Sequence, residues 1–197
     1  ALARRITAAS QRIADGSDDP ADVLWMSYDS IELLPVEPLI GYEGDQGYWV
    51  EAHSDGDDVS ITVGRPDMHN WGYDIPICGS GTVTPTLLET GRPHELIDFV
   101  AAMHTLPTGP IRVIFDIVYG HADNQAVGLM PPAWFTGPDM YGQHLDYLTP
   151  FVRAQLLEMQ RRKADFGADG LRVDGAQDFT YWSHEENDLI RDDDFMT

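Results

Sequence analysis

The sequence predicts an α/β fold in which helices alternate with the parallel strands of a sheet or barrel. Three stretches have the apolar periodicity of helices, and each is followed by a short stretch rich in β-forming residues. The second of these strands, IRVIFDIV, is apolar on both faces, which is typical of a parallel strand covered on both sides. Repeated alternation of helix and strand, with long loops between them, is the pattern of parallel α/β proteins.

The helices are expected over residues 1–15, 93–106 and 150–166, because apolar residues recur in each with a helical period. Gly16 ends the first helix, and Pro150 lies near the first turn of the last. The apolar faces expected to enter the core are Leu2, Ile6, Ala9 and Ile13; Leu96, Ile97, Val100 and Met103; and Val152, Leu156, Leu157 and Met159.

Strands are expected at about residues 30–34, 111–118 and 170–174. Residues 37–63 form a long excursion rich in Gly, Asp and aromatic residues, which we expect to be an ordered loop ending in a short strand, VSITV. Loop packing alone would also explain its aromatic residues. A second long loop is expected from Ala122 to Tyr147, and the polar, acidic end of the chain has the composition of a further loop and helix.

The third strand places opposite charges side by side. Because alternate side chains of a strand share a face, Arg172 and Asp174 are neighbours in GLRVD. A guanidinium beside a carboxylate favours the ionised carboxylate, and an oriented anion suits a nucleophile. A buried pair that only stabilises the strand would have the same pattern. Gly175 follows, and we expect its missing side chain to leave room for a ligand.

The second strand ends in two further candidates. Asp116 interrupts its apolar residues, and a buried carboxylate is costly unless it is paired or hydrogen-bonded, so a site is expected there. His121 lies just past the end of the strand. A histidine in a loop is more often a surface residue, so only its position makes His121 a candidate.

A short polar and aromatic segment precedes the second helix. Within six residues it gathers His69, Trp71, Tyr73 and Asp74. Aromatic faces beside hydrogen-bonding groups suit a sugar, whose CH faces stack and whose hydroxyl groups need partners.

Composition restricts the class of partner. Of the 197 residues, 43% are hydrophobic and 23% charged, as in ordinary globular proteins, and the net charge of −21 would repel nucleic acids and anionic membranes. The single cysteine, Cys78, and the absence of a long apolar run predict a soluble, cytoplasmic protein. The single lysine, Lys163, and the excess of aspartate over glutamate fit adaptation to high salt, and equally a compositional bias of the lineage.

Four segments together resemble the α-amylase superfamily, glycoside hydrolase family 13. DIVYGH is similar to its first hallmark and GLRVDGAQD to its second, while NWGYDI resembles its Gly-Tyr-Asp element and SIELLPV its second barrel strand. The order of the four segments is that of the family. The resemblance implies a TIM (β/α)8 barrel, with the site at the carboxyl ends of the strands and this chain covering about strands 2 to 4 with long βα loops.

Carried over residue by residue, the resemblance implies a retaining α-glycosidase. Asp174 matches the catalytic nucleophile and Arg172 the arginine that orients it. His121 matches the histidine that contacts the sugar at the cleaved subsite, and Asp116 the aspartate that braces this site. The remaining two matches are substrate-binding residues. Tyr73 matches a tyrosine that stacks on the sugar, and Asp74 matches the aspartate that holds a terminal glucose in exo-acting members.

Two departures from the family pattern affect ligands. Gly120 replaces the asparagine that often binds calcium, so we expect neither a cofactor nor a metal; Gln177 and Asp178 replace the usual Lys-His, which argues against long polysaccharides. MPPAWFTGPDMYGQ is most similar to bacterial glucosylglycerol hydrolases. The expected substrate is a small carbohydrate of one or two sugar units, such as glucosylglycerol, because Asp74 beside Tyr73 would close the pocket behind a terminal glucose.

The catalytic acid is expected beyond Thr197. A retaining glycosidase needs a second carboxyl group about 5 Å from the nucleophile, and Glu185 and Glu186 lie in a polar stretch without the strand that would present it. We therefore expect residues 1–197 to be part of a catalytic domain with N- and C-terminal parts missing, inactive alone. A sugar-binding or interaction protein on the same fold, a phosphorylase and a transglycosidase remain alternatives, and the oligomeric state is not predicted.

Overall fold

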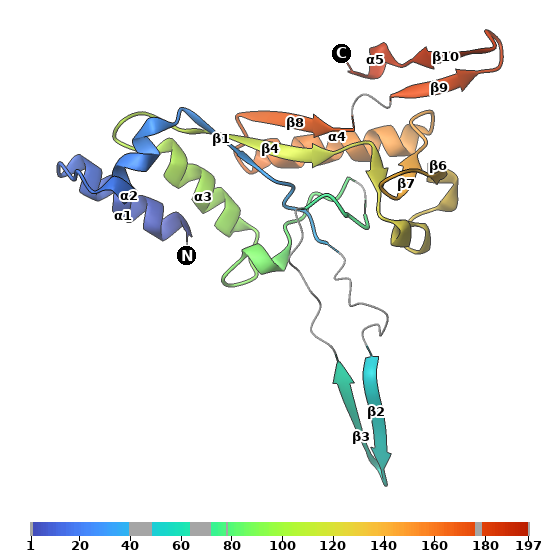
Figure 1. Ribbon diagram of the computed structural model, residues 1–197, viewed down its shortest axis with the longest axis horizontal. Coiled ribbons are helices and arrows are strands. Elements are labelled where there is room, and N and C mark those ends of the chain that lie inside the picture. The colour runs from blue at the N-terminus through green and yellow to red at the C-terminus, as the bar shows by residue number, and fades with distance from the viewer. Residues whose placement is uncertain (1, 40–48, 64–71, 78, 176–178, 197) are drawn as a thin grey trace.

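The computed structural model describes residues 2–39, 49–63, 72–77, 79–175 and 179–196 (Figure 1). Its central feature is a parallel sheet of three strands in the order β1 (Ser30–Leu33), β4 (Arg112–Val118) and β8 (Gly170–Asp174). The predicted α/β class and all three strands are confirmed. The described residues form three strands of this sheet and no closed barrel.

Three long helices accompany this sheet, as predicted: α1 (Leu2–Ala14), α3 (His94–His104) and α4 (Pro150–Asp165). Buried residues of α1 and α3 form one apolar cluster with the first part of β4, and buried residues of α4 form another with Ile117 and the loop that follows β4. Both clusters contact Leu171 of β8. Strand β8, which carries Arg172 and Asp174, therefore packs against both apolar clusters.

Some residues expected in the helix cores are exposed instead. Ile97 and Leu157 face solvent, while Phe99 and Lys163 are buried, and Leu2 at the start of α1 is also exposed. Adjacent helical residues point about 100° apart, so a face centred on Leu96 or Leu156 leaves the next residue outside. This offset was not predicted because the apolar pattern alone does not say where the packed face is centred.

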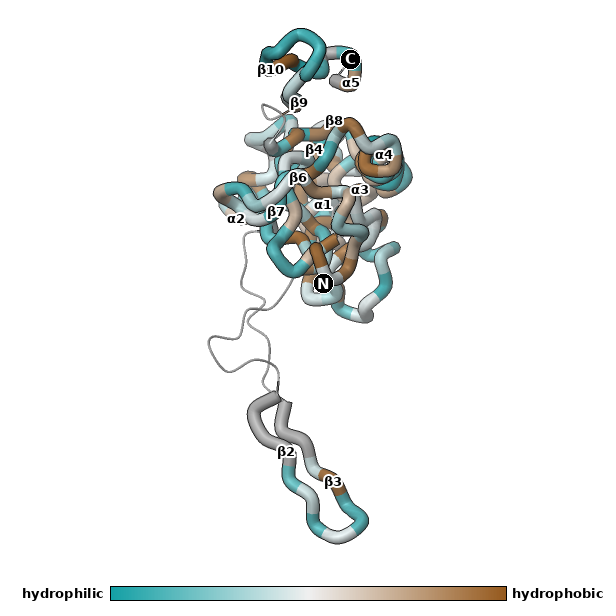
Figure 2. The backbone as a smooth tube through the Cα atoms, turned by 90° about the vertical axis from the view of Figure 1, so that its right-hand side faces the viewer, coloured by the Kyte–Doolittle hydropathy of each residue, from teal (hydrophilic) through white to brown (hydrophobic). Residues whose placement is uncertain are grey.

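The long excursion after β1 contains a hairpin where the sequence predicted mainly loop. Strands β2 (Trp49–Asp55) and β3 (Asp58–Val63) pair antiparallel, so VSITV is confirmed as a strand but its partner was missed. The turn contains Gly56 at φ +62°, at a position where two-residue hairpins favour glycine. Residues 53–60 at the tip are exposed and mostly hydrophilic (Figure 2).

The second long loop also carries a small sheet. Strands β5 (His121–Ala122), β7 (Gln143–Leu145) and β6 (Phe135–Pro138) pair antiparallel in that order. Near the C-terminus a hairpin of β9 (Thr180–Ser183) and β10 (Asp188–Arg191) replaces the loop expected there. Strands of two to four residues are too short for their alternation to stand out in sequence.

The remaining elements are short. Two four-residue helices are α2 (Pro20–Val23) and α5 (Asp193–Met196). Single 3₁₀ turns span Leu24–Ser27, Pro85–Leu87, Asn124–Gly128 and Pro132–Trp134. Across the described residues, no helix has the length and apolar character needed to cross a membrane.

Candidate active site

The candidate site lies at the carboxyl ends of β4 and β8. In the parallel register Asp116 lies opposite Arg172 and Val118 opposite Asp174. The backbone N–H of Tyr119 donates to the carbonyl of Asp174 at 2.9 Å, which extends the pairing past the end of β4. The strands thereby place two carboxylates and one guanidinium together.

One nitrogen of Arg172 contacts both carboxylates. Its Nη1 lies 2.7 Å from Asp174 Oδ1, and 3.0 and 2.8 Å from Asp116 Oδ1 and Oδ2. Hydrogen bonding to Asp116 raises the pKa of Arg172 above its ordinary value. The side chain of Asp116 is 1% exposed, that of Asp174 27% and that of Arg172 44%. Asp116 is thus the buried partner, and Asp174 is the carboxylate that a ligand can reach.

Tyr73 completes the environment of Asp116. Its hydroxyl donates to Asp116 Oδ2 and lies 3.3 Å from Arg172 Nη1. Burial and this hydrogen bond raise the pKa of Tyr73 to about 12. The phenol therefore keeps its proton to a higher pH than an ordinary tyrosine and remains a donor to Asp116.

The segment that carries Tyr73 is held at this end of the sheet by backbone contacts. Gly72 has φ +105°, and a Cβ there would lie 2.6 Å from the carbonyl oxygen of Pro35, just after β1. The N–H of Asp123 donates to the carbonyl of Ile75 at 2.8 Å. Asp74 lies between these anchors and is half-buried.

His121 lies against the same segment. Its side chain is buried, and Nε2 lies 3.2 Å from the carbonyl oxygen of Tyr73. The ring of Tyr141 also lies close to His121, with 5.4 Å between the two ring centroids. The structure therefore brings Tyr73, Asp116, His121, Arg172 and Asp174 into one connected group, whereas His69 and Trp71 lie outside the described residues.

Gly175 has a role different from the predicted one. At φ +73°, a Cβ on this residue would lie 2.6 Å from Gly120 Cα, and a Cβ on Gly120 would lie 2.9 Å from Gly175 Cα. The space beside Gly175 is filled by the backbone of Gly120, so the expectation of room for a ligand was wrong. The two glycines instead allow the chain to leave β4 and β8 in close contact.

The described side chains do not meet the requirements of a metal site. Within the residues that the structure describes, no group of three or more His, Cys, Asp or Glu side chains is placed to hold a metal ion. At position 120 the chain has a glycine, which offers no side-chain ligand.

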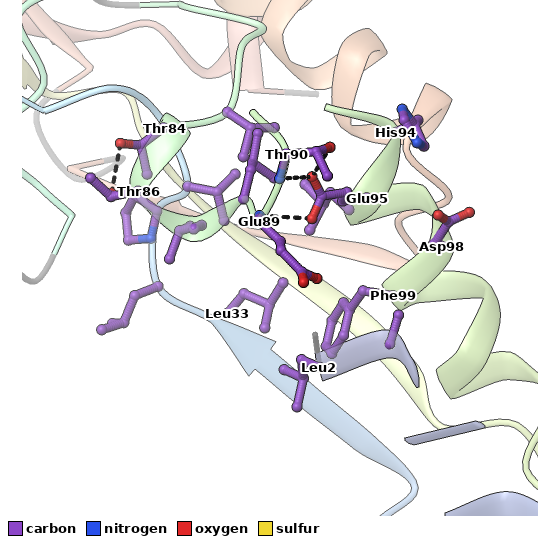
Figure 3. A pocket seen from close by; sticks show the side chains of 18 of the residues that line it. Leu2, Leu33, Thr84, Thr86, Glu89, Thr90, His94, Glu95, Asp98 and Phe99 are labelled. Atoms are coloured by element: carbon purple, nitrogen blue, oxygen red, sulfur yellow. Dashed lines mark hydrogen bonds between the residues drawn. The ribbon is translucent and has the colours of Figure 1, made fainter. Parts of the chain in front are cut away.

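A cavity of about 580 Å³ lies elsewhere, along α1, β1, α3 and residues 83–90 (Figure 3). Leu33, Leu87 and Phe99 contribute to its apolar wall, and Glu95, which also lines it, accepts hydrogen bonds from the backbone of Glu89 and Thr90. None of the six candidate site residues lines this cavity. The candidate chemistry is therefore at the carboxyl ends of the strands and not here.

Tyr141 was not among the candidates from sequence. It lies in the loop between β6 and β7, and its only sequence signal was an aromatic residue within DMYG. Its proximity to His121 follows from the antiparallel pairing of β5 with β7.

Solved structures with the same fold are amylase-type enzymes. The noncanonic maltogenic α-amylase AmyB from Thermotoga neapolitana matches with a TM-score of 0.50 at 19% identity, covering 87% of this chain and 35% of that one. Pullulanase from Anoxybacillus sp. LM18-11 matches with a TM-score of 0.51 at 19% identity, over 77% of this chain and 21% of that one. The chain thus spans about a third or less of these structures.

The fold of this chain is therefore similar to that of amylase-type enzymes. The family described as hypothetical glycoside hydrolase 5 matches residues 2–197. The chain belongs to that family, and the resemblance seen in the sequence is confirmed.

Proposed function

We propose that the chain carries the nucleophile of a retaining α-glycosidase. The observation that supports this role most directly is the sharing of one Arg172 nitrogen between buried Asp116 and accessible Asp174. Asp116 holds the guanidinium, and the guanidinium in turn orients Asp174. A fixed, ionised and reachable carboxylate is what a nucleophile at an anomeric carbon requires.

In this mechanism an oxygen of Asp174 attacks the anomeric carbon while the glycosidic C–O bond breaks. The leaving oxygen takes a proton from a carboxylic acid, and a water molecule, deprotonated by the resulting carboxylate, then displaces Asp174 and releases the sugar. We propose that this acid lies outside residues 1–197. Glu185 and Glu186 are exposed in the turn between β9 and β10, which supports their exclusion.

The proposed substrate is a small α-glucoside such as glucosylglycerol or a short oligosaccharide. Tyr73 and Asp74 would close the pocket behind a terminal glucose, with His121 against the same sugar. Carbohydrate as substrate is supported by the similar pullulanase of Anoxybacillus, which has been solved with bound maltotetraose. The net charge of −21 disfavours nucleic acids and anionic membranes as partners, and we propose a cytoplasmic protein that acts without a cofactor.

In (β/α)8 terms, we propose that β1, β4 and β8 are the second to fourth strands of the barrel. All three strands are parallel, and their order in the sheet is their order in the sequence. A long helix lies between each strand and the next, α3 before β4 and α4 before β8. The remaining strands would belong to other parts of the protein. This arrangement is consistent with the share of the amylase and pullulanase chains that residues 1–197 cover.

The role of Asp174 as nucleophile is tested by introducing Asp174→Asn into the full-length protein that contains this chain, here called the parent. We expect turnover of glucosylglycerol and maltose to be abolished, while Asp98→Asn, on the exposed face of α3, leaves it unchanged. An Asp174→Asn variant with near-parental activity on each glycoside would refute the role. Product analysis with and without phosphate separates hydrolysis from phosphorolysis, and a parent that binds sugar but cleaves none would be a binding protein.

A further inference from the structure

Tyr141 presents an aromatic ring beside the candidate active site. The ring centroids of Tyr141 and His121 are 5.4 Å apart, with planes inclined by 32°. Tyr141 is 57% exposed, whereas His121 is buried and also contacts the backbone carbonyl of Tyr73. A chain of contacts therefore runs from Asp116 through Tyr73 and His121 to the accessible ring of Tyr141.

The turn that carries Tyr141 is held in place before any ligand binds. Asp139 Oδ1 accepts hydrogen bonds from the N–H groups of Tyr141 and Gly142, each at 2.7 Å, and the Asp139 N–H donates to the Gly142 carbonyl at 2.9 Å. A Cβ on Gly142 would lie 2.2 Å from the carbonyl oxygen of Ala122, so the turn packs directly against β5. The backbone that carries the ring is thus fixed against the strand that contains His121.

The pairing of β5 with β7 also connects the turn of Tyr141 to His121. His144 of β7 lies opposite His121 of β5, and β7 begins only two residues after Tyr141. A ring that is more than half exposed and yet carried by a constrained turn keeps a large apolar face available to solvent. Binding to such a face needs little ordering of the loop, which favours affinity.

We propose that Tyr141 is a substrate-binding residue whose ring stacks on the CH face of the sugar, or of the group linked to it, next to His121. The inference rests on the proposed carbohydrate substrate and assigns a further contact to that site. Aromatic rings bind apolar faces while their polar edge stays in water. Tyr141 would therefore strengthen binding of the whole substrate more than it would promote bond cleavage.

The expected effect is on affinity. Replacing the ring in Tyr141→Ala should weaken maltose binding by about three- to tenfold, the range for loss of one aromatic contact, and raise KM similarly with kcat little changed. Tyr141→Phe keeps the ring and should remain within about twofold of the parent. Tyr141→Leu keeps apolar bulk without an aromatic face and should behave like the alanine variant.

The matched control is Tyr28→Ala. Tyr28 is 53% exposed and lies just before β1, at the opposite end of the parallel sheet from the site. Its replacement should leave maltose affinity unchanged. Thermal melting of all variants verifies that each is folded, and the exposure of Tyr141 predicts midpoints close to that of the parent.

Affinity is measured by calorimetric titration of maltose and glucosylglycerol into the full-length protein carrying Asp174→Asn, with and without each Tyr141 or Tyr28 substitution, so that the sugar is not cleaved. Kinetics are measured in parallel on the variants that retain Asp174. Loss of affinity in Tyr141→Ala and Tyr141→Leu but not in Tyr141→Phe or Tyr28→Ala supports the inference. Parental affinity in Tyr141→Ala overturns it while leaving the glycosidase proposal intact. A parent that neither binds nor cleaves either sugar overturns both. If the Asp174→Asn variant is catalytically active while Tyr141→Ala binds sugar more weakly, only the role of Asp174 as nucleophile is overturned.

Discussion

At the scale of single residues, the site depends on how the charge of Asp116 is compensated. An ionised carboxylate buried without partners would cost several kcal/mol. Here Tyr73 donates one hydrogen bond to it and Arg172 supplies a positive charge. Because the same guanidinium also contacts Asp174, the interaction that keeps Asp116 in the strand also orients the proposed nucleophile.

Tyr73 leads to a prediction about alkaline pH. Its pKa is about 12 in the folded protein, against an ordinary value of 10.0, so the folded state holds the phenolic proton more tightly than the unfolded state. The stabilisation linked to this proton is complete below about pH 10 and is lost as the pH rises toward about 12. The difference in unfolding free energy between the parent and Tyr73→Phe should therefore be constant up to pH 10 and decrease above it.

This difference can be measured by urea unfolding at a series of pH values, with ultraviolet difference spectra to follow phenolate formation. Tyr28→Phe provides the control, because Tyr28 is exposed and lies away from Asp116. A Tyr73 phenolate that forms at pH 10 in the folded protein would contradict the hydrogen bond to Asp116.

At the scale of elements, a buried ion pair connects α4 to the segment that follows β1. Lys163 on α4 pairs with Glu37, and both side chains are almost completely buried. Burial raises the pKa of Glu37, and the charge of Lys163 opposes that rise. Lys163 Nζ also lies over the rings of Phe115 and Phe166, at 5.9 and 5.8 Å from their centroids. The ion pair thus fixes Glu37, the first residue of the long excursion, against α4.

Removing one partner of this pair should be strongly destabilising. We expect Lys163→Met to lower the free energy of unfolding by about 3–5 kcal/mol, because Glu37 would remain buried without a counter-charge. The double variant Glu37→Leu/Lys163→Met should recover most of that loss. Arg161→Met is the control on the same helix, since its ion pairs with Glu158 and Asp165 are exposed.

Urea unfolding of the four proteins measures these differences. Equal stability of Lys163→Met and Arg161→Met would show that the buried pair is not what holds the excursion to α4.

At the scale of the whole molecule, the described sheet has two open edges. Both β1 and β8 pair with β4, and the sheet extends no further on either side within the described residues. Next to β1, a cavity of about 580 Å³ is lined by residues of this strand, α1 and α3. Unpaired strand edges and uncovered apolar surface favour association over a cooperative native state.

We therefore expect residues 1–197, produced alone, to melt without a sharp transition and to show no glycosidase turnover. Without the proposed acid, general acid catalysis worth roughly 10²- to 10⁴-fold would also be missing. Thermal melting and assays on maltose and glucosylglycerol test both points. A sharp melt with robust turnover would mean that these residues contain everything the reaction needs.

The sequence by itself determined the three parallel strands, the three long helices and the shared face of Arg172 and Asp174. These features depend on spacing between near neighbours, two residues in a strand and three to four in a helix, and that spacing is visible without knowing the fold. Their places in the sequence also made Tyr73, Asp116 and His121 candidates, and the family hallmarks added an expected role for each.

Only the tertiary structure decided which distant residues meet. The hydrogen bond between Tyr73 and Asp116, the burial of Lys163 against Glu37 and the ring of Tyr141 beside His121 each join separate segments. The close contact of Gly120 and Gly175 likewise replaced the expected ligand space. Local periodicity carries no information about such contacts, because they arise when strands pair and helices pack across long separations in the chain.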